Sequence, residues 1–358
     1  MSLKEKVRFL GLGNYGCKQV KIFFDMGYKA MFANGSEQDL KILGDVPNIF
    51  HLKGFDGFGG HRERALDCLA INKEFIEALQ NITEEIVFVV YADGGSTGSG
   101  SAPICMEILL EDNDGETTSK IICPINALPS SNESVVKHKN AYHAVQELQE
   151  IDGLGSAFFI NNDASSDYSY INNTFARMLD AFLTNDSYGE INNFDESEKM
   201  EMLRNNGAMI LSLVGTDKEA SVLLEKLTKN GIFAPIESDR VCENIAIIHS
   251  GKDNSDITAS DVIAEVGKPA NVFEGYNNNG RSLVVASGLS YPISHVRKIG
   301  ELAQKVSEER QRSRNMSIQK LCDLEIEEPT VLKHDDKPVK KPSKLAALRE
   351  KQAKIQQR

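Results

Sequence analysis

Short apolar runs and longer amphipathic segments alternate along the first half of the chain. The apolar runs suit strands that are buried on both faces of a parallel sheet. These runs are residues 6–10, 28–33, 85–91, 120–125 and 157–160. Segments with apolar side chains at helical spacing lie between them, at residues 19–26, 66–80 and 133–148. The alternation predicts an α/β fold with a doubly wound parallel sheet.

The second half of the chain has a different pattern. Residues 168–183 place apolar side chains at helical spacing and predict one long central helix. Beyond Asp186 we expect four strands and two helices, which together predict a second, smaller α/β domain. The strands are residues 208–214, 232–236, 244–249 and 282–287, and the helices are residues 218–229 and 260–265.

Two more helices are predicted towards the end of the chain. Residues 296–324 predict a charged helix, and the Pro- and Lys-rich residues 327–344 have a composition typical of disorder. Ser343 is placed to cap a final helix over residues 344–356. The apolar positions on one side of this last helix are Leu345, Leu348 and Ile355.

These elements divide the chain into five expected parts, which differ in charge. The parts are a first domain over 1–165, a central helix over 166–187, a second domain over 188–292, a C-terminal helix over 293–326 and a tail over 327–358. From Thr330 on, nine Lys/Arg and three Asp/Glu give a net charge of +6, whereas the whole chain carries −12, which leaves −18 on the remainder. The acidic body argues against non-specific DNA binding by the body. The basic tail either binds a partner electrostatically or only solubilises the chain.

The six cysteines are scattered, with no CxxC pair and no accompanying histidine cluster. This arrangement argues against a zinc site and against a disulfide framework, and it favours buried, reduced thiols. The first residues have no signal-peptide pattern, and no apolar run approaches the roughly 20 residues that a membrane helix needs. We therefore expect a cytoplasmic protein with no membrane partner.

A glycine motif follows the first predicted strand. Gly11, Gly13 and Gly16 have the GxGxxG spacing, which lets backbone N–H groups approach a phosphate at a helix N-terminus. A dinucleotide site also needs an acidic residue at the end of the second strand, but that strand ends in Asn34, and Glu37 lies beyond the turn. An NAD-dependent oxidoreductase is therefore an alternative that rests on this motif alone.

A second glycine loop is the stronger signal. The sequence GGSTGSG directly follows the buried run at 85–91 and precedes a helical segment. Its backbone N–H groups and hydroxyls can surround a phosphate chain. No GxxxxGK[ST] motif is present, which excludes a P-loop with its lysine. The loop comprises Gly94, Gly95, Ser96, Thr97, Gly98, Ser99 and Gly100.

GGSTGSG resembles the tubulin/FtsZ signature GGGTGSG, which binds the phosphates of GTP. The resemblance implies a GTPase that takes GTP and GDP with Mg²⁺. Other loops match in the same order. The matching phosphate-side residues are Gly11, Gly13, Asn14 and Tyr15 in the first loop, Asn34 in the second, and Gly59 and Gly60 in the γ-phosphate-sensing loop GFGG.

The resemblance extends to the ribose and base. PSSNESVVK at 129–137 places Glu133 and Lys137 at the family spacing on the ribose side. FINND at 159–163 resembles the base-reading loop, with Asn161 and Asn162. The resemblance implies that Tyr168 stacks on guanine and that Asn172 bonds its edge. A carboxamide has both the acceptor and the donors that the guanine edge needs, although each asparagine taken singly also fits ordinary turn chemistry.

The resemblance also implies catalytic acids that act on a neighbouring subunit in a filament. GEINNFDESEKMEML at 189–203 resembles the FtsZ loop GxxNxDFxD with one residue inserted before the first acid, which selects Asp195 and Glu198. Two acids three residues apart at a helix start share a face and can orient a water for attack on the γ-phosphate. Glu196 and Glu201 compete for these roles, and acids also favour a helix start for electrostatic reasons alone. The magnesium ligands are left open, with Asp39 and Asp56 as candidates.

The resemblance covers residues 6–290, including GAMILSLVG at 207–215 and NVFEGYNNNGRSLVVASG at 271–288. The Lys-rich tail with its terminal helix is most like TubZ, the plasmid and phage partition tubulins. This implies a protein that forms head-to-tail filaments with itself in the bacterial cytoplasm. It also implies that a DNA-binding adaptor engages the tail and that plasmid or phage DNA is the cargo, without direct sequence-specific DNA binding. An FtsZ-like division protein and a phage-centring tubulin are the alternatives within the superfamily.

Overall fold

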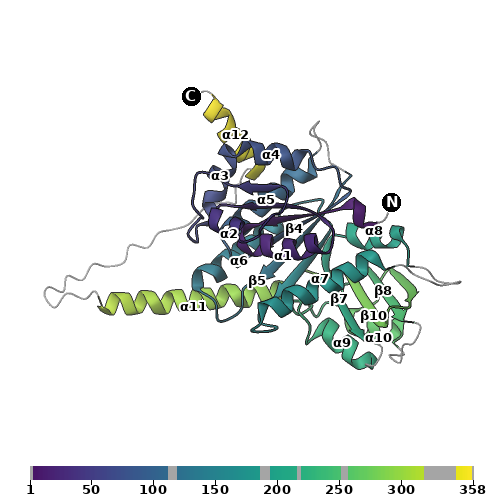
Figure 1. Ribbon diagram of the computed structural model, residues 1–358. Coiled ribbons are helices and arrows are strands. Elements are labelled where there is room, and N and C mark those ends of the chain that lie inside the picture. Colours follow the sequence, from purple (N-terminus) through teal and green to yellow (C-terminus); the bar gives the residue numbers. More distant parts are fainter. Residues whose placement is uncertain are drawn as a thin grey trace.

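The computed structural model describes residues 3–111, 119–185, 194–215, 219–250, 257–317 and 344–356. In these residues ten strands form one sheet in the order β3-β2-β1-β4-β5-β6-β7-β10-β8-β9 (Figure 1). The strands are β1 Val7–Leu12, β2 Lys29–Asn34, β3 Ile49–His51, β4 Ile86–Ala92, β5 Ile121–Leu128, β6 Ser156–Asn161, β7 Gly207–Gly215, β8 Asn244–Ser250, β9 Asn271–Asn277 and β10 Arg281–Leu289.

Strands β1 to β6 pair in parallel throughout. Their apolar runs explain this arrangement, since β4 (IVFVVYA) and β5 (IICPINAL) are buried along nearly their whole length. The strand order reverses between β1 and β4, so the loops that follow these two strands diverge. A crevice therefore forms at the carboxyl ends of the strands.

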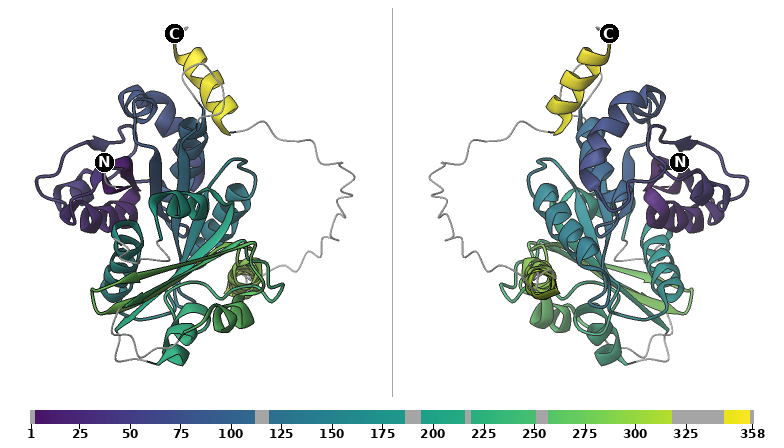
Figure 2. Two further views of the ribbon diagram at one scale, coloured as in Figure 1. Left: turned by 90° about the vertical axis from the view of Figure 1, so that its right-hand side faces the viewer. Right: turned by 90° about the vertical axis from the view of Figure 1, so that its left-hand side faces the viewer.

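Helices cover both faces of the parallel part of the sheet (Figure 2). α1 packs against β1, β2 and β4 and contacts α7, whereas α3, α4 and α6 each pack against α5. The helices are α1 Gly13–Asp25, α2 Glu37–Lys41, α3 Ala65–Ile71, α4 Lys73–Gln80, α5 Thr97–Leu110, α6 Val135–Leu148, α7 Tyr168–Thr184, α8 Glu196–Arg204, α9 Ala220–Thr228, α10 Ala259–Val266, α11 Ile293–Ser317 and α12 Lys344–Gln356, with 3-10 turns η1 Leu3–Lys6 and η2 Arg62–Arg64.

The second part of the sheet has mixed pairing. β7 joins β6 in parallel through the pairs Ser156 with Gly207 and Ala157 with Ala208. β10 is antiparallel to both β7 and β8, and β8 is parallel to β9. The α/β class, the parallel sheet, the long helix α7 and the mixed α/β second part confirm the predicted fold class. The domain boundaries remain predictions.

One predicted helix is two helices in the structure. The periodic pattern predicts a single helix over residues 66–80, but α3 ends at Ile71 and α4 begins at Lys73. Asn72 separates them because its side chain binds backbone elsewhere. Its Oδ1 accepts from the Lys53 amide at 2.8 Å, and its Nδ2 donates to the carbonyls of Lys53 and Cys68.

The strand predicted over residues 232–236 is wrong. Phe233 forms only an isolated bridge with Ile160 in β6. Two backbone bonds flank the bridge, from the Asn161 amide to the Ile232 carbonyl and from the Ala234 amide to the Phe159 carbonyl. Pro235 follows and has no N–H to continue the ladder. Two strands went unpredicted: the short β3 and the largely exposed β9.

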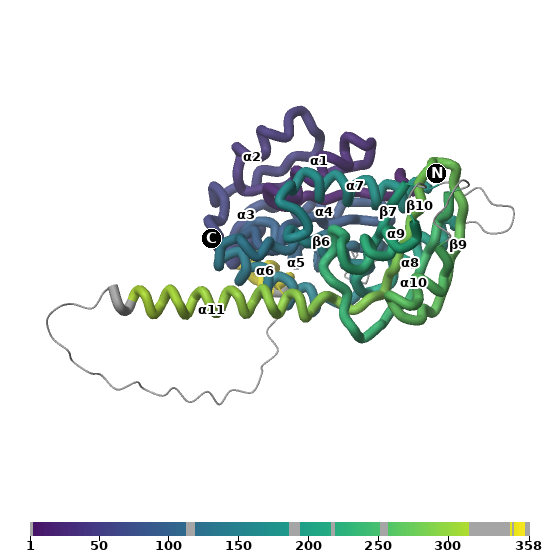
Figure 3. The backbone as a smooth tube through the Cα atoms, turned by 90° about the horizontal axis from the view of Figure 1, so that it is seen from below, coloured from purple at the N-terminus to yellow at the C-terminus, as the bar shows by residue number. Residues whose placement is uncertain are grey.

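The two C-terminal helices lie on the first half of the chain. α11 runs along α6 (Figure 3), and the last seven residues of its predicted span, 318–324, lie outside the described residues. α12 matches its predicted span, and Leu345 and Leu348 are buried, whereas Ser343, the side chain of Ile355 and residues 327–343 lie outside the described part. Every described cysteine is free and buried. Among the helices described, none combines the length and the apolar character that a bilayer span requires.

Candidate functional site

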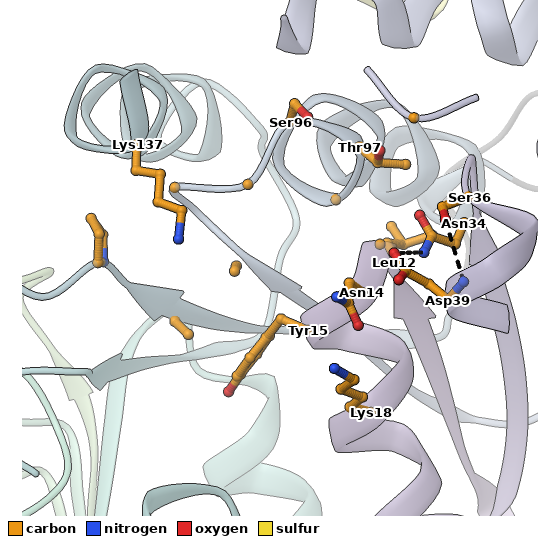
Figure 4. A pocket seen from close by; sticks show the side chains of 18 of the residues that line it. Leu12, Asn14, Tyr15, Lys18, Asn34, Ser36, Asp39, Ser96, Thr97 and Lys137 are labelled. Carbon is orange, nitrogen blue, oxygen red and sulfur yellow. Dashed lines mark hydrogen bonds between the residues drawn. The ribbon is translucent and has the colours of Figure 1, made fainter. Parts of the chain in front are cut away.

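A cavity of about 660 Å³ opens at the carboxyl ends of the parallel strands (Figure 4). The last residues of three strands, Leu12, Asn34 and Ala92, contribute to it, as does Ala127, the penultimate residue of β5. The cavity lies where the strand order reverses between β1 and β4, which is where open α/β sheets bind ligands. The strand order of the sheet therefore fixes the position of this pocket.

Two glycine loops meet at the floor of the pocket. Gly13 begins α1 with φ +72°, and a Cβ there would lie 2.9 Å from the Gly98 amide. Only glycine tolerates both this backbone conformation and this close approach. α5 begins at Thr97, so the N-termini of α1 and α5 both border the cavity. Backbone N–H groups and helix dipoles at two N-termini favour an anionic ligand.

The other two glycines of GxGxxG act behind the pocket. A Cβ at Gly16 would lie 2.1 Å from the Val90 carbonyl, so this glycine lets α1 sit directly on β4. Gly11 lies within β1, where a Cβ would be 2.7 Å from the Gly16 carbonyl. Both positions are therefore packing glycines, and neither lines the cavity.

The second loop is held from behind by buried polar contacts. Gly94, Gly95, Ser96, Thr97 and Gly98 line the cavity, whereas Ser99 is fully buried beneath it. The Ser99 hydroxyl donates to the Gly95 carbonyl. Arg62 donates to the Ser99 carbonyl at 2.8 Å and also pairs with Glu147 at 2.6 Å. The loop conformation is therefore fixed by side chains that do not reach the pocket.

Asn140 of α6 connects the two loops that precede η2 and α5. Its Nδ2 donates to the Gly60 carbonyl at 3.1 Å and lies 3.4 Å from the carbonyls of Gly94 and Gly95. The side chain is buried, so these carbonyls depend on it for hydrogen bonds that water would otherwise supply. Asn140 went unpredicted, because a lone asparagine in a helix carries no sequence signal for such a role.

A buried acid–amide pair supports the start of the same loop. Asp93 directly precedes Gly94 and is fully buried, and Asn126 Nδ2 donates to Asp93 Oδ2 at 2.9 Å. Burial raises the pKa of Asp93 to about 8, against lowering contributions from Asn126 and Arg62. Asp93 Oδ1 and Asn126 Oδ1 have no hydrogen-bond partner among the described groups. A proton on Asp93 would remove the charge of this buried carboxylate.

One wall of the pocket carries the acid considered for magnesium. Asn34 Nδ2 donates to Asp39 Oδ2 at 3.2 Å, and the Asp39 amide donates to Ser36 Oγ at 3.3 Å. All three residues line the cavity, whereas Asp56 does not. Within the described part of the chain, no group of three or more His, Cys, Asp or Glu side chains is arranged to hold a metal ion.

The opposite wall carries an aromatic ring and polar atoms that have no hydrogen-bond partner among the described residues. Tyr168, 43% exposed, lines the pocket, and its hydroxyl donates to Glu133 Oε1 at 3.4 Å. Lys137 pairs with the same glutamate. Asn172 and Tyr15 also line the cavity, and Asn172 Oδ1 and the Tyr15 hydroxyl are buried without a hydrogen-bond partner among the described residues. These groups provide a surface for stacking and acceptors for a planar, hydrogen-bonding ligand.

The predicted catalytic acids lie at the other edge of the sheet. Glu196 pairs with Lys6, which precedes β1, and the Met202 carbonyl accepts from Ser156 Oγ at the first residue of β6. α8 therefore sits at the amino ends of strands whose carboxyl ends form the pocket. Asp195 and Glu198 do not line the cavity. Residues 189–193 of the predicted loop lie outside the described part.

Comparison with known proteins agrees with this arrangement. No protein-family model matches the chain. Over 350 residues the chain is 25% identical to the tubulin-like protein TubZ of Clostridium botulinum C phage, covering 94% of this chain and 95% of that protein. The crystal structure of Clostridium botulinum phage c-st TubZ gives a TM-score of 0.74 at 22% identity, covering 86% of this chain and 99% of that one.

In sequence and in fold this chain resembles the tubulin/FtsZ-like proteins. A further structure with the same fold is a GTPγS-form protofilament of TubZ from Bacillus thuringiensis serovar israelensis. It has a TM-score of 0.72 at 12% identity and covers 88% of this chain and 96% of that chain. The resemblance that GGSTGSG and its companion loops predict, to the tubulin/FtsZ superfamily and within it to TubZ, is confirmed.

The pocket gathers most of the residues that were selected from the sequence. The selected residues that line it are Gly13, Asn14, Tyr15, Asn34, Gly59, Gly94, Gly95, Ser96, Thr97, Gly98, Glu133, Lys137, Asn162, Tyr168 and Asn172. Gly11, Gly60, Ser99 and Asn161 do not line it. Asn161 Oδ1 accepts from the Asp163 amide at 3.0 Å, which is the turn role that an asparagine commonly has.

One cation that lines the pocket went unpredicted. Lys18 lines the cavity one helical turn beyond Asn14, and both side chains project from α1 in Figure 4. Lys137 is neutralised by Glu133, whereas Lys18 has no ion-pair partner among the described residues. The signal was available, because a residue four positions after Asn14 lies on the same helical face.

Proposed function

We propose that the chain binds GTP and GDP in this pocket, hydrolyses GTP and assembles head to tail into filaments. The observation that carries the proposal is the separation of two functional elements on one sheet. The pocket lies at the carboxyl ends of β1, β2, β4 and β5, and the acids of α8 lie at the amino ends. A head-to-tail contact brings the acids of one copy to the pocket of the next.

The nucleotide fits the pocket in one orientation. The phosphates face the N-termini of α1 and α5, where N–H groups and dipoles favour negative charge. The base reaches Tyr168 for stacking, and the unpaired Oδ1 of Asn172, a residue that lines the pocket, is the acceptor for its N–H donors. The GTPγS-form TubZ protofilament shares the fold and supports both the ligand and the assembly.

The pocket residues fit a magnesium ion held mainly by phosphate. Mg²⁺ commonly takes one or two carboxylates and completes its shell with water and phosphate oxygens. Asp39 supplies a carboxylate, and Thr97 supplies a hydroxyl on the loop side. When bound, the ion neutralises charge that develops on the phosphates.

Hydrolysis at a shared site predicts how the activity depends on concentration. Asp195 and Glu198 of one copy orient the attacking water at the nucleotide of the next, so an isolated copy has half of each site. The head-to-tail contact is heterologous and does not close, so it propagates into a filament. Loss of the γ-phosphate weakens the contact, and the filament turns over.

The test is phosphate release per subunit, measured across protein concentration. We expect the rate per subunit to fall steeply below the concentration at which GTP-dependent pelleting and electron microscopy detect filaments. A rate per subunit that stays constant on dilution contradicts the shared site. Guanine nucleotide released from gently purified protein supports the ligand, whereas bound nicotinamide dinucleotide supports the oxidoreductase alternative instead.

We further propose that the filament moves plasmid or phage DNA through a DNA-binding adaptor that engages the basic tail. The similarity to the TubZ of a Clostridium botulinum phage and the net charge of +6 from Thr330 on support this role. The tail is unlike an apolar docking peptide, which disfavours an FtsZ-like division role. We expect to find a small DNA-binding protein encoded beside this chain. We also expect that protein to bind the tail in a salt-sensitive manner.

A further inference from the structure

The C-terminal helix α12 lies on the first domain of its own chain. It packs against α3 and α5, and Figure 1 shows it on the side of the molecule that carries α3, α4 and α5. Leu345 and Leu348 are buried in this contact. The Leu345 amide donates to Glu107 of α5 at 2.8 Å, which satisfies one of the free N–H groups at the start of the helix.

Opposite charges line the two sides of this contact. Lys344 pairs with Glu147 of α6 at 2.6 Å, Arg349 pairs with Glu111, and Lys351 pairs with Asp67 of α3. With Glu107, these carboxylates form an acidic groove, which we define as Asp67, Glu107, Glu111 and Glu147. The groove therefore fits a basic helix with two buried leucines, and α12 is such a helix.

One of these carboxylates, Glu147, also contacts Arg62, which supports the second glycine loop, residues 94–100. We call this loop the phosphate loop. Glu147 Oε2 lies 2.6 Å from Lys344 Nζ and 2.6 Å from Arg62 Nη2. Arg62 Nη2 donates in turn to the Ser99 carbonyl at 2.8 Å. Although burial raises the pKa of Glu147, the hydrogen bonds and charges of Arg62 and Lys344 lower it overall. The carboxylate therefore stays ionised between two cations.

We propose that α12 is coupled to the nucleotide pocket through Lys344, Glu147 and Arg62, so that docking of α12 raises the affinity of the pocket for nucleotide. The proposal rests on the proposed function, since it takes the ligand to be a guanine nucleotide. Arg62 is a positioning residue: it holds Ser99 beneath the loop and does not line the pocket.

The direction of the effect follows from charge. When Lys344 leaves Glu147, the carboxylate neutralises Arg62 alone, and the positive field beneath the phosphate loop falls. The other groove acids lose Arg349 and Lys351 as counter-charges, which makes the region less favourable for an anion. Both changes weaken nucleotide binding. By linkage, nucleotide binding strengthens docking of α12 by the same factor.

The test compares two identical substitutions on α12 in the full chain. Lys344→Met removes one of the two cations that pair with Glu147, and Lys354→Met removes a lysine that pairs, within the described part of the chain, only with Glu350 of the same helix. GDP affinity is measured by titration at protein concentrations below the concentration at which filaments form. We expect Lys344→Met to weaken GDP binding by about threefold to tenfold, and Lys354→Met to bind as the wild type does.

A second variant and a second readout separate coupling from a general loss of charge. We also measure the effect of Lys344→Met in a Glu147→Gln background. There the fold-change in GDP affinity should be less than about half of the fold-change that Lys344→Met causes in the wild type, because the shared carboxylate is gone. Hydrogen exchange in α12 of the wild type should slow when GDP is added. Thermal unfolding of each variant confirms that it folds.

The outcomes distinguish the two ideas. If the wild type binds no guanine nucleotide, the proposed function fails and the coupling fails with it. If the wild type binds GDP but Lys344→Met and Lys354→Met give equal affinities, the coupling alone is wrong. Exchange in α12 that is unchanged by GDP also overturns the coupling.

Discussion

Asp195 and Glu198 cap the same helix end reciprocally. The Glu198 amide donates to Asp195 Oδ1 at 3.1 Å, and the Asp195 amide donates to Glu198 Oε2 at 3.0 Å. This capping box begins α8 and stabilises it. Each acid therefore has a structural role in its own copy as well as the proposed role at the pocket of the next. An alanine substitution would remove both roles together.

We predict that Asp195→Asn abolishes most GTP hydrolysis while leaving fold and assembly intact. Asparagine caps a helix as well as aspartate does, so thermal stability should stay within about 0.5 kcal/mol of the wild type. The amide cannot serve as a base or hold the same charge, so hydrolysis should fall by about 100-fold or more. Filaments should form with GTP and persist, as measured by phosphate release alongside pelleting.

Asp195→Ala is the matched comparison. It should lose hydrolysis and also about 1 kcal/mol of stability, since the cap is gone. If Asp195→Asn hydrolyses GTP normally, the catalytic acid is another residue, and Glu198→Gln or Glu196→Gln identifies it by the same assay. This comparison tests which acid aligns with the first acid of the FtsZ loop, because the residue inserted before Asp195 leaves that alignment open.

A second prediction concerns Tyr168. It lines the pocket beside Asn172, whereas Tyr170 on the same helix is 55% exposed and does not line it. If Tyr168 stacks on the base, Tyr168→Ala should weaken GDP binding by about 1–3 kcal/mol, and Tyr168→Phe should retain most affinity. Tyr170→Ala is the control and should bind normally. Equal losses for Tyr168→Ala and Tyr170→Ala would place the base elsewhere.

A third prediction concerns Asn140, which donates to carbonyls of the two loops that precede η2 and α5. Asn140→Asp keeps the size of the side chain but replaces the donor by acceptors that face these carbonyls. It should destabilise the fold by about 1–3 kcal/mol and weaken GDP binding as well. Asn140→Ala removes the donor without adding charge and should cost less. Titration with GDP and thermal unfolding measure the two effects, and normal GDP affinity in Asn140→Asp would show that the loops hold their shape without it.

The sequence alone predicts most of the fold because its signals are local. A buried parallel strand such as β4 is a continuous apolar run, and the loop after it is recognisable from its glycines. The same signals place the pocket, since parallel strands end at one edge of a sheet. Most residues selected for the site then fall in the cavity because the loops that carry them follow those strands.

What the sequence does not predict depends on contacts between distant segments. Asn72 divides a periodic helix because Lys53 offers backbone partners to its side chain. Asn140 and Arg62 lie on other elements and support the phosphate loop, but the sequence around them has no motif that predicts these contacts. The docking of α12 beside Glu147 brings together segments that are distant in the sequence, so the sequence predicts the helix and its apolar positions but not the surface on which it packs.

The pair formed by Asp93 and Asn126 leads to a prediction about pH. Burial raises the pKa of Asp93 to about 8, whereas the pKa of an aspartate in the unfolded chain is about 4. Between these values the folded chain keeps a proton that the unfolded chain has lost. The contribution of Asp93 to stability is therefore fully present below about pH 4 and is lost as the pH rises through about 8.

Asp93→Asn should remove this dependence. Asparagine still accepts from Asn126 Nδ2 and has no carboxyl group to titrate, so the variant keeps this hydrogen bond at every pH. Between pH 5 and pH 8 the wild type should lose on the order of 3 kcal/mol relative to the variant. Denaturant unfolding of both proteins at each pH measures this difference, in which titration of all other groups cancels. Parallel stability curves for the two proteins would mean that Asp93 is ionised throughout, and its unpaired oxygen would then need a different partner.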